Sequence, residues 1–75
     1  MKQDILALLQ EILPQIDFTS SEALVDEGIL DSVSVVEVVS ELSVEYDITV
    51  PYNEIVPENF NSLDAIVKLV ERLKK

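Results

Sequence analysis

The chain has 75 residues, 48% of them hydrophobic, which is enough for one small domain over residues 1–75 with a single core. It contains no cysteine and no histidine, which excludes disulfides, thiolate metal sites and a cysteine nucleophile, and removes the commonest general base. Fifteen acidic residues against five basic ones give a formal charge of −10, which argues against nucleic acid and anionic membranes as partners and favours basic protein surfaces.

The first predicted element is a helix that ends before Pro14. Its apolar residues recur at the spacing of one buried helix face, at Ile5, Leu8, Leu9 and Ile12. Asp4 is the expected N-cap, and Pro14 ends the run because proline cannot continue a helix. The N-terminal residues lack the basic start and long apolar run of a signal peptide, so we expect a cytoplasmic protein without a membrane span.

Residues 15–31 show no sustained period and are predicted to form a long connection, which in so small a domain indicates a functional or well-packed loop. A short helical turn is expected from Glu22 to Val25, and Gly28, the only glycine, indicates a backbone conformation that other residues resist. Apolar residues are expected to hold this loop against the core, at Phe18, Leu24, Ile29 and Leu30.

Residues 32–46 are rich in valine, which favours a strand, but two stripes at helical period predict a helix. The polar stripe consists of Ser34, Glu37, Glu41 and Glu45. The opposite, apolar stripe consists of Val35, Val38, Val39, Leu42 and Tyr46. Val33 and Val36 lie at the edge of the apolar stripe, so we expect them to be partly exposed beside Ser32 as a small docking patch.

The remaining residues predict two further helical segments. Residues 47–51 are expected to be extended, because a residue that precedes proline is disfavoured in a helix. Tyr52 to Val56 are expected to form one short helical turn that Pro57 ends, and Asn61 or Ser62 then caps a last helix. The apolar face of that helix is formed by Leu63, Ile66, Val67 and Val70. Three substantial helices and one short one predict an all-α fold, a small four-helix bundle.

Asp31 and Ser32 stand at the predicted start of the helix over residues 32–46. The backbone amides of a first helical turn lack intrahelical partners and carry partial positive charge, so a phosphate is favoured there. Ser32 is therefore well placed to carry a phosphodiester, although serine and aspartate are also ordinary residues at a helix start. Asp26, Glu27 and Asp31 lack the spacing of an EF-hand loop, and we assign no metal site to them.

The segment Asp31-Ser32-Val33, with residues 26–30 before it and Val36-Glu37 after it, resembles the phosphopantetheine attachment region of acyl carrier proteins. The resemblance continues through residues 46–51, an aromatic residue followed by a Val-Pro segment, and through residues 59–67. It therefore covers nearly the whole chain in the order and at close to the spacing of that family.

The resemblance implies a right-handed four-helix bundle whose third helix is short. It also implies that a phosphopantetheinyl transferase esterifies Ser32 with 4′-phosphopantetheine from coenzyme A. For Asp31 two readings stay open: it only caps the helix, or it also contacts the transferase. The protein would catalyse nothing itself. It would be a monomer that presents acyl or aminoacyl thioesters to loading ligases and to downstream transferases or synthases. The resemblance implies that such partners dock on the second helix. In this chain the residues expected to contact them are Val33, Val36, Glu37 and Glu41.

Two departures bear on the cargo. Val33 replaces the usual leucine after the serine, and the second helix has fewer acidic residues than in fatty-acid carriers, which indicates a different set of partners. Phe18, residues 28–32 and the Val-Pro segment are also similar to D-alanyl carrier proteins of teichoic acid D-alanylation, although those carry methionine after the serine. Fatty acid synthesis, a specialised pathway and an aminoacyl pathway all stay open.

The charge of −10 by itself supports a function of another class. An unmodified acidic helical domain would bind a basic partner through residues 33–45, without any use for the Ser32 hydroxyl. An enzyme is not predicted, because no nucleophile in the chain has a base to activate it.

Overall fold

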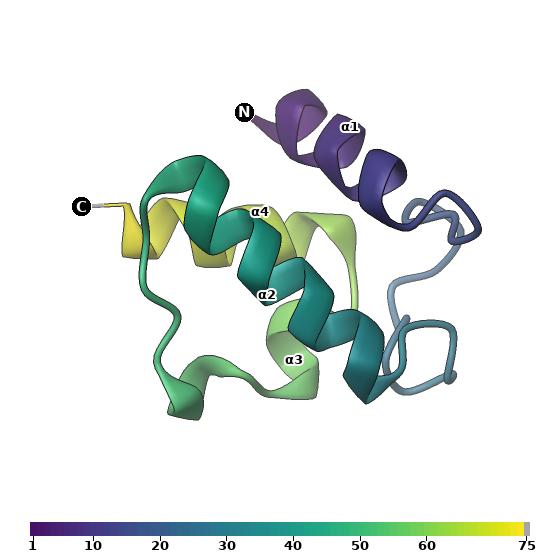
Figure 1. Ribbon diagram of the computed structural model, residues 1–75. Coiled ribbons are helices and arrows are strands. Elements are labelled where there is room, and N and C mark those ends of the chain that lie inside the picture. The colour runs from purple at the N-terminus through teal and green to yellow at the C-terminus, as the bar shows by residue number, and fades with distance from the viewer. Residues whose placement is uncertain (75) are drawn as a thin grey trace.

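The computed structural model describes residues 1–74, and these contain helices but no strand. Four α-helices follow in the order α1 (Lys2–Ile12), α2 (Ser32–Tyr46), α3 (Pro57–Phe60) and α4 (Leu63–Leu73), with a 3₁₀ turn over Tyr52–Glu54 before α3 (Figure 1). This confirms the predicted all-α bundle with three main helices and a short third one. No helix within residues 1–74 is long and apolar enough to cross a membrane.

Helix α1 buries one face and begins earlier than the sequence predicted. Ile5 and Leu9 are fully buried, and the helix ends at Ile12, before Pro14, as expected. The predicted N-cap was wrong: Met1 is the N-cap and Asp4 lies within the first turn. The reason is that the amide of Ile5 donates a hydrogen bond of 3.0 Å to the carbonyl of Met1, which closes the turn before Asp4.

The long connection between α1 and α2 is held by buried side chains at three of its four predicted positions. Phe18, Leu24 and Leu30 are fully buried, whereas Ile29 is exposed, so the prediction for Ile29 was wrong. Ile29 follows directly after Gly28, whose φ of +77° reverses the chain and turns the next side chain outward. Only Leu30, one residue later, reaches the core.

The helical turn predicted over residues 22–25 is displaced toward Gly28. The amide of Glu27 donates to the carbonyl of Ala23 at 2.8 Å, and the amide of Gly28 donates to the carbonyl of Val25 at 3.0 Å. These bonds form a tight turn that Gly28 ends in the left-handed region, so no helix develops there.

Helix α2 has the predicted bounds and the predicted faces. Val38 and Leu42 are fully buried, while Val33, Val36 and Val44 are 67%, 62% and 79% exposed. The helix ends at Tyr46, and its C-cap Asp47 adopts a left-handed conformation with a φ of +52° that directs the chain into the extended residues 48–51. The periodic pattern therefore outweighed the strand propensity of its valines.

The segment between α2 and α4 differs from the prediction in the role of Pro57. Proline was expected to end a helical turn, but Pro57 is the first residue of α3, where its fixed φ fits and its missing N–H is not needed. Of the two predicted caps of α4, the structure uses Ser62, whose hydroxyl accepts a hydrogen bond of 3.0 Å from the amide of Ala65. Asn61 serves a different purpose, described below.

Candidate functional site

Ser32 is the first residue of α2, and its side chain is exposed. The preceding residue, Asp31, has an extended backbone and is the N-cap of the helix. Its carboxylate oxygen Oδ1 accepts a hydrogen bond of 2.8 Å from the amide of Ser34. Asp31 and Ser34 thereby fix the turn from both sides of Ser32. Within residues 1–74 the Ser32 hydroxyl has no hydrogen-bond partner, so it is available to an approaching reagent.

The first turn of α2 favours negative charge at this position. The backbone amide of Ser34 holds the pKa of the Asp31 carboxyl below its usual value, and the Ser34 hydroxyl adds to this effect. An anion attached to Ser32 would meet the positive end of the helix dipole and the amides of the first turn other than that of Ser34, which Asp31 already caps. The exposed start of α2 is compatible with a phosphodiester on Ser32, and the modification of this residue stays a prediction.

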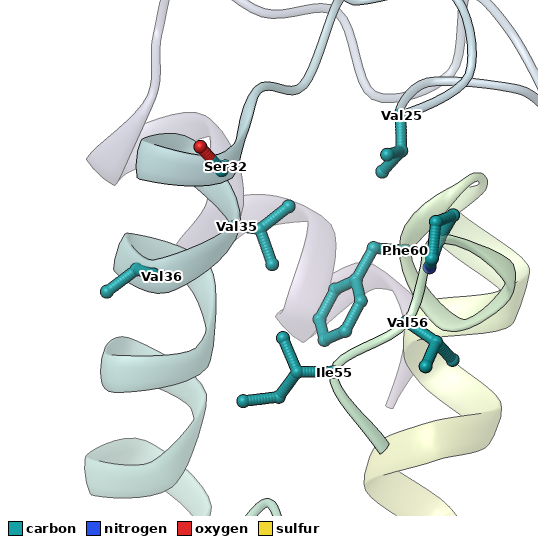
Figure 2. A pocket seen from close by; sticks show the side chains of 8 residues that line it. Val25, Ser32, Val35, Val36, Ile55, Val56 and Phe60 are labelled. Carbon is teal, nitrogen blue, oxygen red and sulfur yellow. The ribbon is translucent and has the colours of Figure 1, made fainter. Parts of the chain in front are cut away.

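An apolar pocket of about 250 Å³ opens beside Ser32, between α2, α3 and the two loops that face them. Ser32 is its one polar lining residue, and the others are Val25, Val35, Val36, Ile55, Val56, Pro57 and Phe60. Figure 2 shows Ser32 at the upper end of α2, with Val25 and Phe60 across the pocket and Ile55 below them. The serine therefore stands at the rim of an apolar space.

Most of this pocket was not predicted. Val35 was assigned to the core and Val36 to a docking patch, and no role was assigned to Val25, Ile55, Val56 or Phe60. One available signal was that Ile55 and Val56 are apolar residues in a segment too short to bury them itself. Both are half-buried, and the pocket that they line with Val35 and Val36 of α2 forms only because the fold brings these distant segments together.

The side chain of Asn61, between α3 and α4, holds the loop that carries Val25. Its Oδ1 accepts hydrogen bonds from the amides of Val25 at 2.9 Å and of Asp26 at 3.1 Å. Its Nδ2 donates to the carboxylate of Asp26 at 3.1 Å, and its carbonyl accepts from the amide of Leu24 at 2.8 Å. Residues 24–26 are therefore hydrogen-bonded to the segment that directly follows Phe60.

The predicted docking residues occupy one exposed side of α2. Val33 and Val36 lie next to Ser32, and Val36 also lines the pocket. Glu37 is exposed and Glu41 is half-buried one turn further along the helix. Val44, which the sequence analysis did not assign to the patch, continues the apolar side chains toward the end of the helix.

The three acidic residues before α2 have separate hydrogen-bond partners. Asp31 caps α2, Asp26 accepts from Asn61, and Glu27 accepts a hydrogen bond of 2.6 Å from the hydroxyl of Ser21. No group of three potential ligands that could hold a metal ion occurs within residues 1–74.

Comparison with known proteins identifies a family. Residues 3–70 match the sequence profile of the family described as "Phosphopantetheine attachment site", a span that begins in α1 and ends in α4. A search of curated proteins found no match, and neither did a search of solved structures.

Proposed function

The chain belongs to the phosphopantetheine attachment-site family of acyl-carrier-type proteins, and we propose that Ser32 is the residue that carries the group. Members of this family bear 4′-phosphopantetheine covalently and carry substrates for enzymes rather than catalysing reactions. They interact with a phosphopantetheinyl transferase and with acyl-handling enzymes. The observation that supports Ser32 is its exposed hydroxyl at the capped start of α2, beside an apolar pocket.

The attachment requires the Ser32 oxygen to act as a nucleophile toward coenzyme A. Oγ forms a bond to the phosphorus next to pantetheine, 3′,5′-ADP leaves, and the hydroxyl proton passes to a base of the transferase. The exposed hydroxyl can be reached, and the amides of the first turn stabilise the phosphodiester that remains. The bound group supplies a thiol for thioester formation, which this chain lacks because it has no cysteine.

We propose an acyl rather than an aminoacyl cargo, for fatty acid synthesis or a specialised pathway. The pocket beside Ser32 is apolar, and its volume of about 250 Å³ exceeds that of a cavity of ~150 Å³ that holds benzene. D-alanine would bring an ammonium group and a single methyl group, and no carboxylate lines this pocket to pair with the ammonium. An aminoacyl cargo would suit a polar site in contact with solvent better than this apolar pocket.

We propose that partner enzymes dock on the exposed side of α2. Val33 and Val36 would enter an apolar depression of the partner, while basic side chains around it approach Glu37 and Glu41. Val44 would extend the contact along the helix. Because Asp31, Glu37 and Glu41 would face basic side chains of the transferase, association with it should weaken as salt is added.

The proposal is tested by intact mass after incubation with coenzyme A and a broad-specificity phosphopantetheinyl transferase. Wild type should gain one phosphopantetheine, Ser32→Ala should gain none, and Ser40→Ala, a second exposed serine of the same helix, should behave as wild type. A wild-type chain that stays at its apo mass, with a transferase active on another carrier, would overturn attachment and favour the unmodified acidic interaction domain.

A further inference from the structure

The walls of the apolar pocket come from separate segments, which core packing and the hydrogen bonds of Asn61 hold together. Val25 belongs to the loop before α2, whereas Phe60 is the last residue of α3. Figure 2 shows these two side chains facing the pocket from separate segments, with Val25 above Phe60. Asn61, the residue after Phe60, makes the polar connection between them.

Asn61 can position Val25 because its side chain binds the backbone on both sides of that residue. Oδ1 accepts from the amides of Val25 and Asp26 at 2.9 and 3.1 Å, and Nδ2 donates to the Asp26 carboxylate. A change of rotamer or of residue at position 61 would therefore release three bonds at once. We call these three side-chain hydrogen bonds of Asn61 the clamp. Since Asn61 directly follows Phe60, the clamp fixes the separation between the pocket walls formed by Phe60 and Val25.

We propose that Asn61 is a positioning residue that sets the width of the apolar pocket and thereby the length of acyl chain that the carrier shields. This inference rests on the proposed function, since it concerns the pocket that would receive the cargo. Asn61 itself does not line the pocket and acts through Val25 and Phe60.

The loop does not depend on Asn61 for its fold, so the role can be tested in a folded variant. Leu24 and Leu30 are fully buried at the two ends of the loop. The amide of Leu30 donates to the carbonyl of Leu24 at 2.9 Å, which closes the loop, and the amide of Leu24 still bonds the carbonyl of residue 61. Asn61→Ala therefore frees Val25 and Asp26 while the anchors on either side remain.

The experiment compares a short and a longer cargo on the same carrier. The transferase loads Ser32 from acetyl- or octanoyl-coenzyme A, and intact mass then follows cleavage of each thioester by hydroxylamine. The acetyl-to-octanoyl rate ratio measures how well the pocket shields the longer chain. Ser62→Ala, which removes the adjacent helix cap but leaves the clamp intact, is the matched control for a general loss of stability. Hydrogen exchange of the Val25 and Asp26 amides, measured in the unmodified protein, reports the clamp independently of any cargo.

For wild type we expect slower cleavage of the octanoyl thioester. In Asn61→Ala this protection should fall by at least about twofold, the lower end of the range for the loss of a single ordinary hydrogen bond. Exchange at Val25 and Asp26 should become faster in the same variant, and Ser62→Ala should change neither. Two results for Asn61→Ala would overturn the role of Asn61 without contradicting the acyl pocket. One is unchanged hydrogen exchange at Val25 and Asp26, and the other is faster exchange while the octanoyl thioester stays as protected as in wild type. Equal cleavage of both cargoes in wild type would instead overturn the acyl proposal itself.

Discussion

The carboxylate of Asp31 accepts a hydrogen bond of 2.8 Å from the backbone amide of Ser34, so the two residues enclose Ser32 within one capped turn. This cap satisfies one of the amides that a helix start leaves unpaired and orders the turn that holds the proposed attachment residue. It also places a negative charge directly beside the proposed attachment residue. Asp31 can therefore contribute to stability and to recognition, and the two roles can be separated.

Replacing Asp31 by asparagine and by alanine should separate capping from recognition. Asparagine also caps a helix, so Asp31→Asn should keep a melting temperature close to that of wild type, whereas Asp31→Ala should lower it. If the transferase reads the charge, both variants should be modified more slowly than wild type. We would measure kcat/KM for phosphopantetheine transfer beside the melting temperature. A wild-type rate for Asp31→Asn would restrict Asp31 to capping.

The Asp31 cap should also give the protein a defined dependence on acid. Hydrogen bonding by Ser34 lowers the pKa of the Asp31 carboxyl in the folded state, so the cap stabilises above the ordinary aspartate pKa of about 4 and is lost as pH falls through the folded pKa. The difference in melting temperature between wild type and Asp31→Ala should therefore be full at pH 7 and shrink below about pH 4. Circular dichroism measures the melting temperatures of wild type and Asp31→Ala at each pH. Glu71→Gln, which removes one exposed α4 carboxylate, controls for net charge, and a difference that persists in acid would contradict this account.

The two faces of α2 should respond differently to the same substitution type. Leu42 is fully buried, so Leu42→Ala should reduce the free energy of unfolding by about 2–5 kcal/mol. Val44 is 79% exposed, and Val44→Ala should change it by less than ~0.5 kcal/mol. Urea unfolding measures both variants. Similar losses at the two positions would mean that α2 is rotated relative to the core. Val44→Ala is also a folded variant in which the proposed docking contact can be tested.

Gly28 should tolerate additional atoms but not a different backbone preference. Its φ is +77°, and a Cβ placed there would meet nothing within 4 Å. Gly28→Ala should therefore cost about 1–2 kcal/mol from the left-handed backbone alone, and Gly28→Asn should cost less because asparagine enters that region more readily. Thermal unfolding should give the highest melting temperature for glycine at position 28, a lower one for asparagine and the lowest for alanine. Equal stability of the glycine and alanine proteins would show that the turn relaxes.

Added salt should stabilise the folded protein. Fifteen carboxylates and five basic residues repel one another on balance, and the ion pairs Lys2–Asp64 and Arg72–Glu54 are too exposed to offset that repulsion. Screening should therefore raise the melting temperature between low and moderate sodium chloride concentration. Sodium sulfate at the same ionic strength is the control. Screening should raise the melting temperature equally in sodium chloride and sodium sulfate, whereas salting-out should raise it more in sulfate. A flat or falling melting temperature would contradict this account.

The sequence determined where the main helices lie and placed Ser32 at the start of α2. Helical period is a local property, so the opposite stripes over residues 32–46 predicted both the helix and its buried face, including fully buried Val38 and Leu42. Local chemistry likewise offered Asp31 as a helix cap, because a capping side chain reaches an amide only two or three residues away. The family resemblance depended on the same segments.

Only the tertiary structure decided the pocket and the residue that holds it. Val25, Val35 and Phe60 belong to three segments with no shared period, and they meet because separate elements bury their apolar faces against one core. Asn61 was a predicted candidate for a local cap, yet its side chain bonds residues 35 and 36 positions away. Such contacts depend on how the elements pack, and packing is a property of the whole chain that no window of neighbouring residues contains.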